Sequence, residues 1–322
     1  MTAIVKDELD HLIDKEWEYL ESRKSEWSLL EGEQDMEVLE HILRCILHMG
    51  RTTEYAADFQ ACAGVQNKDG GWSKQSHENR TSMWITTFVA LKLCRGNMIL
   101  KDSAIAAAID RALAYVLSTQ EKEGHWVDPE WSHLDTTCSV TSFLTIYQVT
   151  HDRQKEERIN QARRRGYEYI IQWQRDQGLW KDDTFHPAGI ETTAHLMQYT
   201  LVPAYFMDGI GYAEKICLEA AESLAGEQEE GGSWDNENMD HTMDACRNLM
   251  LVSDTFGKKE RFAPVIEKGV QWLIANKNPQ GWGDFRDEPS NVERTGDGLD
   301  TLLKHRRYTA GLPMSHFWAY SK

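Results

Sequence analysis

Two kinds of helical segment alternate along the chain. In the first kind, apolar residues recur at i, i+3, i+4 and i+7 and form one stripe, as in residues 103–117 and 264–275. In the second kind, Thr, Ser, Ala and aromatic residues follow one another with little polar face, as in residues 81–91 and 135–144. No segment shows the extended polar–apolar alternation of a half-buried strand. The pattern therefore predicts an all-α protein in which one-sided helices pair with crowded inner helices.

A short Gln…Gly…Trp phrase joins the two kinds of segment. It begins at Gln66, Gln120, Gln174, Gln228 and, with Asn in place of Gln, at Asn276, so the spacing is 54 residues three times and then 48. A period near 50 residues indicates a repeated unit, here an outer helix, a turn and an inner helix. Repeated helical pairs stack into a solenoid or close into a ring. Because neither end of the chain carries an obvious polar capping unit, we favour a ring.

The residues of the phrase are expected to be scaffold. Glycine commonly lies just past a helix end, so the Gly of each copy is expected to end the outer helix. The Gln is expected to hydrogen bond to the end of that helix, and the Trp is expected to pack on the next unit. The tryptophans of the phrase are therefore poor candidates for catalysis.

The composition limits which binding partners and which cellular compartment are expected. The formal net charge of −17 argues against nucleic acid and anionic membrane surfaces as main partners. No apolar run approaches 20 residues, so no membrane-spanning helix is expected, while peripheral membrane contact and the oligomeric state stay open. The N-terminus does not resemble a signal peptide, and the six cysteines show no C-x-x-C spacing. We therefore expect a cytoplasmic protein with reduced thiols.

The Gln-x-x-x-Gly-x-Trp phrase at this spacing resembles the QW repeat of the terpenoid cyclase and prenyltransferase superfamily. Residues 66–91 are similar to a squalene–hopene cyclase segment, and residues 309–320 resemble the closing segment of those enzymes. The resemblance covers about residues 50–320 and implies an (α/α)6 barrel, with two concentric helix rings around a deep cavity. Because 322 residues hold one barrel rather than two, the chain resembles single-domain class II cyclases.

The resemblance also divides the chain. Residues 51–322 are expected to form the barrel. Residues 1–50 are expected to contribute N-terminal helices that pack on the ring, either plugging it or supplying the missing helix of a sixth unit.

The resemblance implies cyclisation that begins with protonation of a terminal alkene or epoxide. The expected small-molecule substrate is a linear polyprenyl chain, in particular a prenylated aromatic acid such as geranylgeranyl-dihydroxybenzoate. The carbocation would run through the folded polyene and close fused rings without a change of mass. No cofactor and no resident metal are expected, and Mg²⁺ would be needed only for a diphosphate substrate.

Asp135 is the first candidate for the proton donor. Relatives with two barrels carry Asp-x-Asp-Asp-Thr-Ala at the start of an inner helix and donate from the middle Asp. The matching residues 132–137 keep only the last Asp and the Thr, and Leu134 stands at the position of the donor. We therefore expect Asp135 to have taken the role, with Cys138 on its side of the helix and His133 tuning its proton affinity. The alternative is that Asp135 only caps the helix.

Other carboxylates occupy similar positions in later units. Glu191 lies near the start of the third inner segment, with His195 one turn further on. Asp240 and Asp244 make the start of the fourth inner segment the most polar, although Asp244 could pair with the arginine three residues on. Residues 297–300 are acidic too and are expected to lie in a solvated loop.

Aromatic residues on the inner segments are candidates to line the cavity. Electron-rich rings stabilise carbocations through cation–π attraction, worth about 2 kcal/mol or more when the cation is desolvated. An aromatic stripe is also typical of an ordinary helical core. The rings expected to face the cavity are Trp84, Phe88, Trp131, Tyr199 and Phe317.

Two other classes of function stay open. A protein prenyltransferase β-subunit shares the ring and would hold Zn²⁺ with Asp, Cys and His. Asp240, Cys246 and His305 are the candidates for that zinc site, although the close Asp-x-Cys spacing is missing. The other class is a non-catalytic, lipid-binding ring, because a fold does not imply a function.

Overall fold

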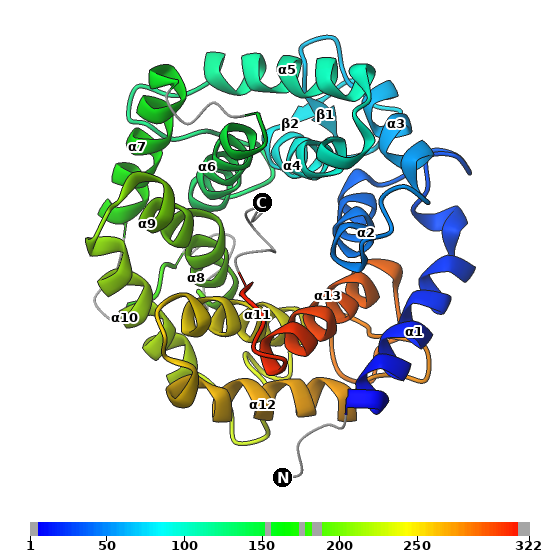
Figure 1. Cartoon of the computed structure of the whole chain (residues 1–322), viewed down its shortest axis with the longest axis vertical. Coiled ribbons are helices and arrows are strands. Elements are labelled where there is room, and N and C mark those ends of the chain that lie inside the picture. Colours follow the sequence, from blue (N-terminus) through cyan, green and yellow to red (C-terminus); the bar gives the residue numbers. More distant parts are fainter. Residues whose placement is uncertain (1–5, 152–155, 174–177, 182–188, 315–322) are drawn as a thin grey trace.

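Two concentric rings of helices enclose a central space in the computed structural model, which describes residues 6–151, 156–173, 178–181 and 189–314 (Figure 1). The outer ring consists of α1 (Lys6–Ser22), α3 (Ala56–Gly64), α5 (Ser103–Ser118), α7 (Glu157–Gln172), α10 (Tyr212–Gly226) and α12 (Lys259–Ala275). The inner ring consists of α2 (Met36–Met49), α4 (Met83–Leu100), α6 (His133–Thr150), the run of α8 (Ile190–Leu196), the π-helix η2 (Met197–Leu201) and α9 (Val202–Asp208), then α11 (Met239–Thr255) and α13 (Val292–Thr309).

Small elements occupy some of the turns, namely η1 (Lys24–Glu26) and the antiparallel pair β1 (Trp72–Ser73) and β2 (Thr81–Ser82). The expected all-α class and (α/α)6 architecture are confirmed. Of the helices in the described ranges, none has the length and apolar character that crossing a membrane requires.

The two rings differ in burial as the sequence pattern predicts. The buried residues of the outer helix α5 form one stripe, with Ile105, Ala108, Ala112 and Val116 among them. The inner helices α4 and α6 bury residues 83–96 and 134–148 without interruption. An inner helix contacts its two neighbours, the outer ring and the centre of the barrel, so it has no face left for solvent.

The Trp and the Gln of the phrase hold different parts of the ring together, as the copy at residues 120–126 shows. Trp126 donates from Nε1 to the Val116 carbonyl at the end of α5 (2.8 Å), and its backbone N–H donates to Thr137 Oγ1 on α6 (3.2 Å). Gln120 donates from Nε2 to the Ala162 carbonyl on the next outer helix, α7 (2.9 Å). Trp126 also lies against the next unit as expected, since a Cβ at Gly166 on α7 would lie 3.3 Å from its Cζ3. The expected bond from the Gln to the end of its own outer helix was wrong, because the fully buried indole makes that bond and the Gln bonds to the next outer helix.

The Gly of the phrase serves close packing rather than helix termination. Gly124 lies beyond the end of α5, which is capped by Thr119, and has a positive φ of 100°. A Cβ at Gly124 would lie 2.6 Å from the Arg165 carbonyl oxygen on α7. Glycine is therefore required for the turn to approach the next outer helix, and the expectation that it ends the helix was wrong.

The N-terminal helices form the sixth unit of the ring. α1 packs against α13, and α2 packs against both α13 and α4, so these helices complete the ring rather than plug it (Figure 1). Trp27 is fully buried and donates from Nε1 to the Leu20 carbonyl (2.8 Å), as the phrase tryptophans do to their own outer helices. Lys277 Nζ lies 2.7 Å from Glu16 Oε1 and ties the last turn to α1. The chain division at residue 50 stays a prediction.

We expect Trp27→Ala to lower the free energy of unfolding by about 3–5 kcal/mol, the usual cost of truncating a buried tryptophan. Trp173→Ala is the matched control, because Trp173 is 46% exposed, and it should cost about 0.5 kcal/mol or less. Chemical denaturation followed by circular dichroism measures both. Equal losses for the two variants would contradict the assignment of Trp27 to a sixth scaffold turn.

Candidate active site

A cavity of about 320 Å³ lies at the end of the barrel where the inner helices begin. The second residue of each of α2, α4, α8, α11 and α13 lines it, namely Glu37, Trp84, Glu191, Asp240 and Glu293, and Trp131 lies just before α6. Helix N-termini carry partial positive charge and favour nearby carboxylates. The convergence of the inner helices therefore explains why acidic side chains gather here.

Aromatic rings form one wall of this cavity. Trp84 stacks on Trp131 with 4.4 Å between ring centroids, and Phe88 meets Trp84 edge-on at 4.6 Å. Tyr199 continues the wall, 5.2 Å from Phe88. These four predicted rings all line the cavity. Phe317, the fifth, lies outside the described residues.

The rest of the described lining is charged or ionisable. Its members come from α2, α8, α11, α13 and the turn after β1. They are Glu37, Glu40, His41, Arg44, Lys74, Glu191, His195, Asp240, Asp244, Arg247, Glu293, Arg294 and Asp297.

Asp135 lies behind this lining, fully buried. Its Oδ2 accepts hydrogen bonds from Ser132 Oγ (2.6 Å) and Thr192 Oγ1 (3.2 Å), and its Oδ1 lies 3.4 Å from His195 Nδ1. The N-cap of α6 is Ser132, whose Oγ accepts the Asp135 N–H, so Asp135 stands at the third helical position and is not itself the cap. Asp135 is not among the described residues that line the cavity. Its role as proton donor stays a prediction.

His195 stands between Asp135 and the cavity. Its Nε2 lies 3.3 Å from Asp244 Oδ2, so each ring nitrogen faces a carboxylate. Burial opposes a charged imidazole, yet Asp244 and Asp135 raise the pKa of His195 well above its usual value. Cys138 donates from Sγ to the His195 carbonyl (3.2 Å). His133 is exposed, and its ring stacks on His125 rather than on the residues of this site.

Asp240 and Asp244 lie on adjacent turns of α11, and their surroundings shift their pKa values in opposite directions. Burial raises the pKa of Asp240 to about 7; Arg294 opposes the rise, and the carboxylates of Asp297 and Asp244 add to it. Burial acts on Asp244 in the same direction, but Arg247 and His195 lower the pKa of Asp244 to about 2. The Asp240 side chain is also 26% exposed, against 6% for Asp244. Asp240 is therefore the cavity carboxyl whose surroundings favour its protonated form more than those of Asp244 do.

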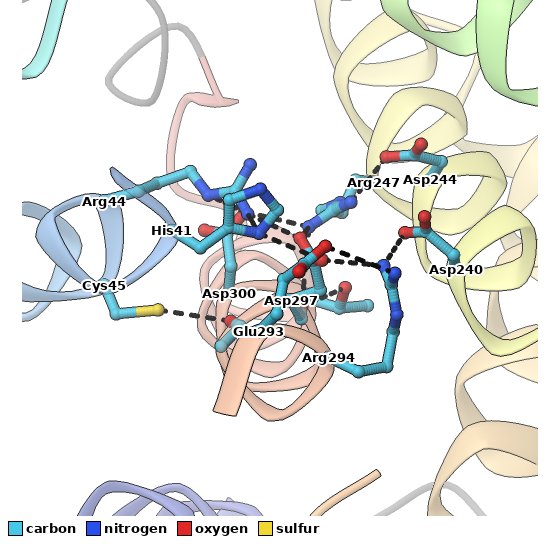
Figure 2. Close-up of polar contacts among 12 residues, drawn as sticks. His41, Arg44, Cys45, Asp240, Asp244, Arg247, Glu293, Arg294, Asp297 and Asp300 are labelled. Atoms are coloured by element: carbon cyan, nitrogen blue, oxygen red, sulfur yellow. Dashed lines mark hydrogen bonds and ion pairs between the residues drawn. The ribbon is translucent and has the colours of Figure 1, made fainter. Parts of the chain in front are cut away.

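Asp297 on α13 is the centre of a buried ion-pair network (Figure 2). It accepts from Arg44 on α2 (2.5 Å), Arg247 on α11 (2.6 Å) and Arg294 (2.9 Å), and it lies 3.1 Å from His41 Nδ1. Burial acts to raise the pKa of Asp297, but His41, Arg247 and Arg44 together hold it well below its usual value. Arg294 also pairs with Asp240, so the network reaches the cavity carboxyl.

Sequence reasoning missed this network for an identifiable reason. The expectation of a solvated loop at residues 297–300 was wrong, because these residues lie within α13 and are buried. The last Trp of the phrase, Trp282, precedes the start of α13 by 10 residues, within the range of 5 to 11 residues found in the other units. The repeat itself was therefore a signal for an inner helix here.

The candidate zinc residues do not come together. Asp240 lines the cavity, whereas Cys246 Sγ faces Gly269 on α12 and His305 Nε2 lies 3.1 Å from Glu267 Oε2, also on α12.

No protein-family model matches this sequence, and no curated protein matches it. Among solved structures, the chain is similar to the α-1,6-mannanase GH76A of Salegentibacter sp. HEL1_6 (TM-score 0.70, 13% identity, 92% of this chain and 99% of that chain). It is similar to a possible GH105 member from Salmonella enterica (0.68, 14%, 95% of each chain). It is also similar to the type II terpene cyclase MstE from Scytonema, solved with geranylgeranyl dihydroxybenzoate (0.63, 12%, 94% and 99%). These likenesses establish the toroid fold, which is shared by cyclases and glycan-active enzymes.

We expect Asp297→Asn to lower the free energy of unfolding by about 3–5 kcal/mol, because it leaves buried arginines without their shared counter-charge. Asp284→Asn is the control: Asp284 also pairs with Arg294, but its side chain is 52% exposed, so about 0–1 kcal/mol is expected. Urea denaturation compares the two variants. A loss at Asp297 no larger than the loss at Asp284 would contradict a structural role for the network.

Proposed function

We propose that this protein is an acid-initiated cyclase of the class II type, with Asp240 as the proton donor. The observation that supports this most is the composition of one cavity. A carboxyl group with a pKa of about 7 shares it with four contiguous aromatic rings. The pairing suits a reaction that begins with proton transfer to carbon and then carries positive charge on carbon until a proton is lost.

The reaction can be written from these residues. The Asp240 carboxyl gives its proton to the terminal alkene of the substrate, forming a C–H bond, and becomes a carboxylate paired with Arg294. The cation left on the neighbouring carbon is attacked by the next double bond, so a ring closes. Trp84, Trp131 and Phe88 stabilise the moving charge through their ring faces. Loss of a proton from carbon ends the reaction, so substrate and product have the same mass.

His195 and Asp135 support the acid in this proposal rather than supply it. Asp135 fixes the orientation of the His195 ring from behind the cavity wall. His195 and Arg247 keep Asp244 ionised, and that neighbouring negative charge favours the protonated form of Asp240. Asp135 is thus a positioning residue, whereas the sequence alone led us to expect it as the donor.

The proposed substrate is a prenylated aromatic acid. Its prenyl tail would lie along the aromatic wall, and its polar head would meet the charged side of the cavity, where Arg44, Lys74 and Arg294 are among the lining residues. The likeness to MstE, whose structure holds such a compound, supports this choice. Mg²⁺ would enter only with a diphosphate substrate.

The direct test is turnover. Purified protein is incubated with geranylgeranyl-dihydroxybenzoate, squalene or geranylgeranyl diphosphate, and products of unchanged mass are sought by chromatography and mass spectrometry. We expect an isomer from the prenylated acid. Binding of all three without an isomer would contradict the proposal and favour a lipid-binding ring.

Asp240→Asn should lower kcat by about 10²–10⁴-fold, because it removes the acid. Asp135→Asn should lower it less. Since the protonated Asp240 is the active form and its pKa is about 7, wild-type turnover should fall as the pH rises through 7. Full activity of Asp240→Asn together with loss in Asp135→Asn would return the donor role to Asp135, provided both variants keep the wild-type circular dichroism spectrum.

A second candidate is a glycan-active enzyme. The observation in its favour is that, outside the aromatic wall, every described lining residue is charged or ionisable. The likeness to an α-1,6-mannanase points the same way. Incubation with α-1,6-mannotetraose and other oligosaccharides, read by released reducing ends, tests it. Cleavage without any cyclisation would replace the cyclase proposal.

A further inference from the structure

Three ligand-type side chains converge on one side of the cavity. The ligand atoms of Glu191, His195 and Asp244 all lie within 4.8 Å of one another. Glu191 and His195 are one turn apart on α8, and Asp244 comes from the neighbouring inner helix α11. All three line the cavity. The group therefore combines an imidazole nitrogen with two carboxylates at a place that a small ligand can reach.

Each of the three side chains is also held from behind. His195 Nδ1 lies 3.4 Å from Asp135 Oδ1, which orients Nε2 toward Asp244. Asp244 is paired through its other oxygen with Arg247, and Glu191 Oε2 lies 3.5 Å from His241 Nε2. A carboxylate behind a histidine, and hydrogen bonds behind ligating carboxylates, are the usual outer shell of a protein metal site. The imidazole with a fixed direction distinguishes this group from a mere row of acidic residues.

We propose that Glu191, His195 and Asp244 form a binding site for one divalent transition-metal ion. One nitrogen and two oxygen donors suit ions such as Zn²⁺, Co²⁺ and Mn²⁺ better than hard cations that require only oxygen. The ion takes the position of the proton on His195 Nε2, and that proton passes to solvent. The two carboxylates then balance the two charges of the ion, and the neutral imidazole supplies its lone pair.

Such an ion would have coordination positions open to the cavity. It would present a Lewis acid to an oxygen atom of a ligand lying along the aromatic wall. The site is argued from the geometry of the three side chains and of the residues that hold them. It does not rest on the proposed cyclase reaction, and a binding measurement without substrate tests it separately.

The experiment uses the full chain, treated with a chelator and then titrated with Co²⁺ while the visible absorbance is recorded, with calorimetry of Zn²⁺ as the second probe. We expect saturation at one ion per chain. His195→Gln and Asp244→Asn should abolish saturable binding. Asp135→Asn, which touches only the outer shell, should weaken binding about 10–100-fold.

Glu37→Gln is the matched control. Glu37 is a carboxylate of the same cavity but belongs to α2 and pairs with Lys74 at 2.9 Å, so its loss should leave the affinity unchanged. Absence of saturable binding by the wild type would overturn the proposal. Equal binding by wild type, His195→Gln and Asp244→Asn would also overturn it, since the ion would then lie elsewhere. Circular dichroism of every variant confirms that a loss of binding is not a loss of fold.

Discussion

The buried carboxylate of Asp297 is the interaction on which ring closure and the cavity both depend. Asp297 lies on the last inner helix. It forms ion pairs with Arg44 on α2, Arg247 on α11 and Arg294 on α13 (Figure 2). α2 and α13 are the first and last inner helices of the chain, so bringing them together carries a loop-closure cost. Buried ion pairs add little net stability over apolar packing, but breaking one is costly. We therefore regard the network as fixing how α2 and α13 align where the ring closes.

The same network sets the chemistry of the cavity. Arg294 is shared between Asp240, Asp297 and the more exposed Asp284, so it compensates Asp240 only in part. Convergence of the inner helix N-termini brings further carboxylates to the same end of the barrel. The pKa of one member of this acidic group, Asp240, is therefore raised, and aromatic rings line another side of the same cavity. The closure of the ring at α2 and α13 and the raised pKa of Asp240 therefore both follow from the same arrangement of charged side chains.

The fold could be predicted because the Gln…Gly…Trp phrase marks the same turn between an outer and an inner helix in each repeat. In the copy at residues 120–126, the Trp, Gln and Gly are fixed by hydrogen bonds and close approach to their own or the next outer helix, so the spacing of such phrases reports the ring directly. The sequence pattern did not identify Trp27 as part of a sixth unit, because its turn has neither the Gln nor the Gly of the phrase. Only the buried hydrogen bond from its indole to the Leu20 carbonyl is shared with the other copies. Trp84, Phe88 and Tyr199 line the cavity from inner helices, which have no solvent face to which a ring could turn, and Trp131 lines it from the turn before α6.

The arrangement of acids could not be predicted in the same way, because it arises between helices. Asp135 was recognised from a degraded motif, but its position behind His195 depends on how α6 packs on α8. The acidity of Asp240 depends on Arg294 and Asp297, more than fifty residues away in the chain. The most direct measurement is cyclisation of geranylgeranyl-dihydroxybenzoate in D₂O, with the product returned to H₂O before mass spectrometry. We predict one deuterium bound to carbon in each cyclised product, because the Asp240 carboxyl exchanges with solvent and starts the reaction. A cyclised product without carbon-bound deuterium, or no cyclised product, would contradict protonation by this acid.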